Sequence, residues 1–64
     1  MHADSAQLSS IATGLVELTE RVTAIADRHA GAPDREAVAG GLYEVERSLQ
    51  GASRRLARVI RQLG

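Results

Sequence analysis

In LSSIATGLVELTERVTAI, residues 8–25, an apolar residue recurs at alternating steps of three and four. This spacing is that of the a and d positions of a heptad repeat, so it predicts a helix whose apolar stripe packs against a partner helix. The stripe consists of Leu8, Ile11, Leu15, Leu18, Val22 and Ile25. A single helix cannot bury such a stripe by itself, so the partner must come from elsewhere in the chain or from another chain.

The second half of the chain carries a matching stripe. Its members are Val38, Leu42, Val45, Leu49, Ala52, Leu56, Val59 and Leu63. Between the two stripes lies GAPD, in which Gly31 is suited to end a helix in a left-handed conformation and Pro33 is suited to begin the next helix. The fold class expected from this pattern is all-α, an antiparallel two-helix, coiled-coil-like hairpin.

The expected hairpin is a single domain over residues 1–64, with helix one over about 4–30, a turn at about 31–33 and helix two over about 33–63. Asp4, followed three residues later by Gln7, has the form of a capping box at the start of helix one. Folding the chain at the turn sets Val22 opposite Val45, and this register brings a positions against d positions along the whole length.

The length of the chain limits what this hairpin can bury. A domain of about 60 residues buries only about 60% of the surface that its unfolded chain exposes, so small folds usually need a disulfide, a metal or a partner. The chain has no cysteine, and its two histidines are far apart in sequence. Oligomerisation remains, and we expect two hairpins to pair as a homodimer into a four-helix bundle.

Beside each predicted a/d stripe, the e and b positions carry small or apolar residues, whereas the remaining positions carry nearly all the charge. A wide apolar band rimmed by charge is typical of an association surface. The sequence therefore predicts a partner interface formed by Ala12, Val16, Ala26, Tyr43, Ala57 and Ile60. Its partner is either a second copy of the chain or a helical face of another protein, and the sequence leaves both possibilities open.

No residue pattern in the chain indicates catalysis. The Gly40-Gly41 pair lacks the context of a phosphate-binding loop, and no Glu-x-x-His motif is present for a metal site in a bundle. No general base is near in sequence to Ser9, Ser10, Ser48 and Ser53. We therefore expect no enzyme activity, no cofactor, no metal and no small-molecule substrate. The predicted function is that of a non-catalytic interaction or assembly module, such as a small adaptor, accessory subunit or regulator.

A cluster of arginines near the C-terminus supports a function of a different class. It consists of Arg54, Arg55, Arg58 and Arg61. Such a basic helix end can contact a polyanion, which makes a nucleic-acid-associated regulator the alternative hypothesis. The formal net charge of zero argues against general polyanion binding, and the same arginines also suit the negative end of the helix dipole.

The first ten residues contain no basic segment followed by an apolar run, and no stretch is long and apolar enough to span a membrane. We therefore expect a cytoplasmic protein without a membrane partner. Export without a cleaved leader is compatible with the same sequence.

Overall fold

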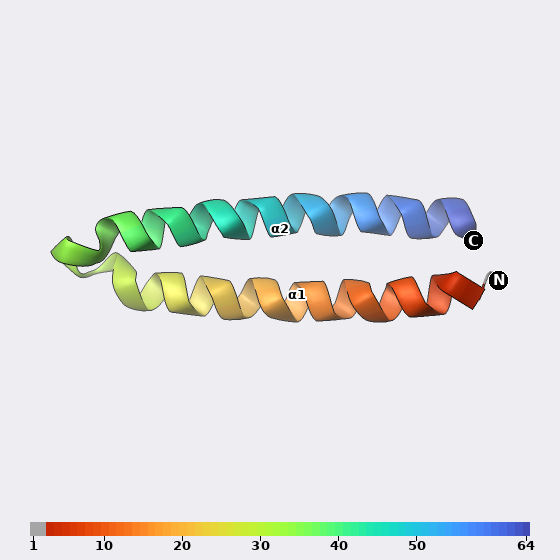
Figure 1. Ribbon diagram of the computed structural model, residues 1–64, viewed down its shortest axis with the longest axis horizontal. Coiled ribbons are helices and arrows are strands. Elements are labelled where there is room, and N and C mark those ends of the chain that lie inside the picture. The colour runs from red at the N-terminus through yellow and green to blue at the C-terminus, as the bar shows by residue number, and fades with distance from the viewer. Residues whose placement is uncertain (1–2) are drawn as a thin grey trace.

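Two long helices account for nearly all of residues 3–64, which are the residues described in a computed structural model. Helix α1 spans Ala3–Ala30 and helix α2 spans Glu36–Leu63, with a short 3₁₀ helix, η1, at Pro33–Arg35 between them. The helices run antiparallel and side by side, so that the start of α1 and the end of α2 lie at the same end of the molecule (Figure 1). The predicted helical hairpin is confirmed.

The turn is built around the residue that precedes proline. Ala32 is extended, with φ −99° and ψ 120°, because the ring of Pro33 disfavours a helical conformation at the residue before it. The Ala32 N–H donates to the His29 carbonyl at 3.1 Å, and the Arg35 N–H donates to the Ala32 carbonyl at 2.9 Å. Helix α1 therefore ends through proline sterics and a tight turn.

Two local predictions at the helix ends were wrong. No glycine among the described residues has a positive φ, so Gly31 does not adopt the left-handed conformation expected of it. The extended Ala32 already redirects the chain, which removes the need for a left-handed residue. Asp4 lies inside the first turn of α1, which includes Ala3, and so it is not the residue that caps the helix.

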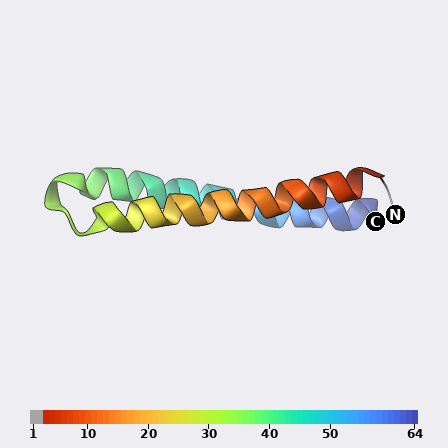
Figure 2. The same cartoon turned by 90° about the horizontal axis from the view of Figure 1, so that it is seen from below.

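The hairpin is long and thin. Its Cα atoms extend over 50 × 14 × 9 Å and their radius of gyration is 14.9 Å, whereas a compact chain of this length has a radius of about 11 Å. The two helices cross at a shallow angle (Figure 2), as helices in coiled coils do. The surface between α1 and α2 is therefore the main place where the isolated chain can form a core.

The residues between the helices form an inner seam, which differs from the predicted one. On each helix the inner seam follows the a and e positions of the heptad, and its members are all buried or half-buried. They are Ser5, Leu8, Ala12, Leu15, Thr19, Val22 and Ala26 on α1, and Ala39, Leu42, Glu46, Leu49, Ser53, Leu56 and Ile60 on α2. The predicted a positions are thus retained except at Leu63, which is 36% exposed, but the predicted d positions lie outside the seam.

Small side chains explain why the e positions face inward. Ala26 is 0% exposed and Ala39 is 4% exposed, and residues of this size allow two helix backbones to approach closely. Thr19 is also buried, and its hydroxyl donates to the Leu15 carbonyl at 2.7 Å, which satisfies its polar group within its own helix. No large side chain among the described residues is fully buried, so this seam is a thin core.

Candidate protein-interaction face

Large aliphatic side chains that were expected inside the hairpin lie on its surface. We call this surface the apolar flank, and it consists of Ile11, Leu18, Ile25, Val38, Val45 and Val59. Their exposed fractions range from 39% at Ile25 to 56% at Ile11. The apolar flank runs along both helices, and each of its members occupies a d position that the sequence had assigned to the core.

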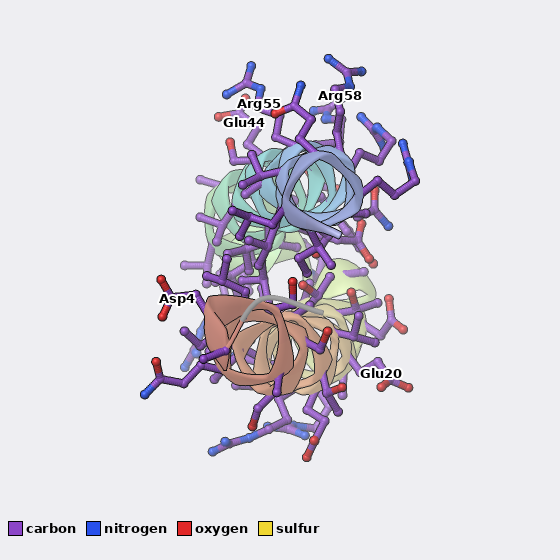
Figure 3. The ribbon with its side chains drawn as sticks, turned by 90° about the vertical axis from the view of Figure 1, so that its right-hand side faces the viewer. Asp4, Glu20, Glu44, Arg55 and Arg58 are labelled. Carbon is purple, nitrogen blue, oxygen red and sulfur yellow. The ribbon has the colours of Figure 1, made fainter. Side chains whose placement is uncertain are left out.

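Heptad geometry places all six residues on the same side of the hairpin. Residues seven apart share a stripe along a helix, and equivalent positions of two antiparallel helices that face one another lie on the same flank. Asp4, seven residues before Ile11, marks one side of the end view, and Glu20 marks the opposite side (Figure 3). On the side of Asp4, the region between the helices shows mainly carbon atoms, while Arg55 and Glu44 lie above it on α2.

The opposite side of the hairpin, which we call the polar flank, carries two hydrogen bonds between the helices. The Tyr43 hydroxyl donates to Asp27 Oδ1 at 2.5 Å. The Thr23 hydroxyl lies within bonding distance of both the Glu46 carboxylate and the carbonyl of Thr19, so its single proton serves two acceptors. These contacts fix the register of the two helices.

The bond to Asp27 also affects the ionisation of Tyr43. Hydrogen bonding to the Asp27 carboxylate raises the pKa of Tyr43 above its ordinary value of 10.0, with smaller contributions from desolvation and from the charges of Asp27 and Glu46. The phenol must be protonated to donate this bond, and a tyrosinate beside two carboxylates would be repelled. The polar flank is therefore held together by a neutral tyrosine.

An open hollow of about 470 Å³ also lies on the polar flank. It is lined by Val16, Thr19, Glu20, Gln50, Ser53 and Arg54. Ligand pockets are mostly enclosed and lined by apolar groups, whereas this hollow is wide open along the helix groove. Residues 3–64 contain no group of three or more His, Cys, Asp or Glu that could hold a metal ion.

The predicted partner interface is divided by the structure. Ala12, Ala26 and Ile60 belong to the inner seam, and Ala26 is fully covered, so it cannot touch a partner while the hairpin is closed. Val16 is 50% exposed and Tyr43 and Ala57 are half-buried, at b positions on the side of the polar flank. The six residues therefore do not form one continuous surface, because the helices are rotated relative to the predicted a/d packing.

The sequence contained a signal for this rotation. Three columns of each helix (a, d and e) are free of charge over most of their length, but a two-helix seam accommodates only two columns. The e column carries Ala, Ser and Thr at most positions, whereas the d column carries Ile, Leu and Val at most positions. Small residues at a close helix contact therefore could have indicated that a and e pack together and that d faces outward.

The arginine cluster lies on the outside of α2. Arg54, Arg55, Arg58 and Arg61 are all exposed, and within residues 3–64 no carboxylate comes within 4.0 Å of their guanidinium groups. The one ion pair described for residues 3–64 joins Arg35 to Asp34 at 3.8 Å. The acidic residues of α1 thus do not neutralise the cluster through direct pairs.

Comparisons with known proteins give no relative for this chain: no family model, no curated protein and no solved structure matches it. Neither helix, as far as it is described, is long and apolar enough to cross a membrane. The fold and its surface therefore define a class by geometry alone, an antiparallel helical hairpin with one exposed aliphatic flank.

Proposed function

We propose that this chain is a non-catalytic interaction or assembly module that binds another helical surface through the apolar flank. The observation that carries the proposal is the exposure of six large aliphatic side chains in two parallel columns. Scattered exposed aliphatic residues are ordinary, but a stripe that extends about 20 Å along α1 and about 30 Å along α2 is typical of an interface.

The composition of the apolar flank suits a helical partner. Gly14 and Gly41 border its columns, and at both glycines an added Cβ would meet nothing within 4 Å. A neighbouring helix can therefore approach the backbone closely at these points. Ile, Leu and Val at d positions supply the side chains that interlock with such a helix.

The experiment compares two aliphatic residues of equal exposure that lie on different flanks. Leu18 and Val16 are both 50% exposed and lie two residues apart in the middle of α1. Because the chain has no Lys or Cys, a carboxyl-reactive cross-linker is used on an extract of the source cells that contains the tagged full chain. Specific adducts, with itself or with another protein, should form for the wild type and for Val16→Asp. Leu18→Asp should give none, because a carboxylate in the apolar flank would be buried without a partner.

Loss of adducts with Val16→Asp and their retention with Leu18→Asp would assign binding to the polar flank and contradict the proposal. Circular dichroism of each variant, measured alongside, shows whether the helices persist. If Leu18→Asp loses its helicity, Leu18→Gln replaces it, because an uncharged polar side chain weakens an interface while disturbing a half-exposed site less.

The exposed arginine cluster favours a second candidate function, association with nucleic acid. Arginines that lack carboxylate partners are available to phosphate groups, which they bind through paired N–H donors. By heptad position Arg54, Arg58 and Arg61 lie away from the apolar flank, whereas Arg55 lies beside it. Contact with a polyanion can therefore coexist with protein binding.

Fluorescence anisotropy with a labelled oligonucleotide tests this second function over a range of salt concentrations. Binding should weaken with salt with a slope of about −0.9 per neutralised phosphate on duplex DNA, and Arg54→Gln with Arg58→Gln should lower both affinity and slope. The matched control is Arg21→Gln with Arg28→Gln on α1, which removes the same charge outside the cluster. Equal losses for the two double variants, or no binding at low salt, would remove this function.

A further inference from the structure

We infer that the occupant of the apolar flank is a second copy of this chain, paired face to face into a four-helix bundle about a two-fold axis. This inference rests on the proposed function, because it names the partner for the same surface. Three properties of the hairpin carry it: the area of the flank, the number of apolar columns on each helix, and the balance of charge around the face.

The face of the hairpin that carries the apolar flank is large enough for a stable dimer. The face that contains both helices measures 50 × 14 Å between Cα atoms, which projects to about 700 Å² per copy. Specific interfaces bury about 800 Å² on each partner, so a face of this size is sufficient if it is used along its whole length. A partner that covers the whole face must be equally long and apolar, and a second copy of the hairpin presents an identical face.

The isolated hairpin exposes more surface than a compact protein of its mass, and the excess is close to the area that one partner buries in a specific interface. A compact 6.8 kDa protein exposes about 3,950 Å², whereas the hairpin exposes 4722 Å². The excess of about 800 Å² is close to the area that one copy would lose on pairing. Pairing therefore turns an over-exposed hairpin into a subunit with an ordinary exposed surface.

The column pattern of each helix indicates a bundle and not a two-stranded coil. A helix that faces one partner needs two apolar columns, whereas a helix in a bundle buries a and d together with e or g. In α1 the inner seam uses Leu15 and Thr19, and this leaves Leu18 to face a second neighbour. The same division holds on α2, where Leu42 and Ala39 face inward and Val45 faces outward.

Charge around the face permits a second copy. The formal net charge of the chain is zero, so two copies meet without net repulsion. Asp4, Glu44 and Arg55 border the side on which the flank lies, so both signs of charge are present at its rim (Figure 3). A two-fold axis brings each rim against a rim of the other copy, which allows acidic and basic groups to meet.

Thiol protection tests the pairing with conservative substitutions. The chain has no cysteine, so Leu18→Cys and Val16→Cys each introduce a single thiol, and their parent side chains are equally exposed at 50%. Under reducing conditions the alkylation rate of each purified full-length variant is followed by mass spectrometry over a dilution series. Sedimentation equilibrium of the same samples gives the molar mass.

The paired bundle predicts that the Leu18→Cys thiol reacts at least about tenfold more slowly than the Val16→Cys thiol at high concentration, because it must wait for the dimer to open. The difference should disappear on dilution, and the mass should fall from twice 6.8 kDa toward 6.8 kDa over the same range. Equal rates at every concentration, or protection of the Val16→Cys thiol instead, would overturn the inference.

The wild-type chain separates failure of this inference from failure of the proposed function. A monomer that is only partly helical and melts without a cooperative transition would show that the flank needs a different protein, so self-pairing is wrong while the interaction function stands. A monomer that is fully helical and melts cooperatively would show that the flank needs no cover, which contradicts both.

Discussion

Truncation of Leu18 to alanine separates an isolated hairpin from a paired one by the size of its effect. In the isolated hairpin half of the side chain is already exposed. Burying a whole leucine stabilises a fold by about 1.5–3 kcal/mol, so removal of a half-buried one should cost about 1 kcal/mol. In this case the loss does not depend on protein concentration.

In the paired bundle the same leucine is a core residue. Truncation of a core leucine costs about 2–5 kcal/mol, and a two-fold axis repeats the site, which gives about 4–10 kcal/mol for the dimer. The lower figure already raises the dissociation constant about a thousandfold. Leu18→Ala should therefore lower the unfolding midpoint strongly at micromolar protein and depress it further on dilution.

The assay is urea denaturation followed by circular dichroism at several protein concentrations. Val16→Ala is the matched control, because Val16 has the same exposed fraction on the other flank. Its free energy of unfolding should stay within about 0.5 kcal/mol of the wild type, since surface substitutions are usually small and alanine favours the helix. A loss of only about 1 kcal/mol for Leu18→Ala, with a midpoint independent of concentration, would show that Leu18 is not buried in a dimer.

Two further predictions use neighbouring glycines and the single tyrosine. Gly40→Ala should stabilise the chain by about 0.5–1 kcal/mol in thermal melts, because alanine favours a helix more than glycine does. Gly41 borders the apolar flank, so Gly41→Ala should stabilise the chain less or destabilise it. Equal stabilisation by the two substitutions would show that no neighbouring helix lies close to Gly41. Because the pKa of Tyr43 is raised in the folded chain, its contribution is fully present below pH 10.0 and is lost as the pH rises through the folded pKa. The chain contains no Lys or Cys to titrate in this pH range. The free energy of unfolding should therefore fall more steeply with pH for the wild type than for Tyr43→Phe. Equal slopes for the two proteins would contradict the hydrogen bond from Tyr43 to Asp27.

The interface predicted from the sequence does not coincide with the exposed aliphatic surface of the structure. An a/d seam predicts an interface at the e and b positions, because that packing leaves Val16, Tyr43 and Ile60 as the largest apolar groups outside the seam. The structure brings Tyr43 to Asp27 and Thr23 to Glu46 instead, so this side is occupied by polar contacts within the chain. The four arginines of the cluster are exposed, as their charge and spacing indicate, and polyanion contact by them stays a prediction.

The two helices and the hairpin turn follow from local features of the sequence. Heptad spacing sets the helical period, and Pro33 forces an extended conformation on Ala32, and both effects act between residues close in the chain. Which two of the three apolar columns meet is set by packing between the helices. That choice depends on how closely the backbones approach at Ala26 and Ala39 and on hydrogen bonds between residues distant in sequence, and it moves Leu18 from the core to the surface.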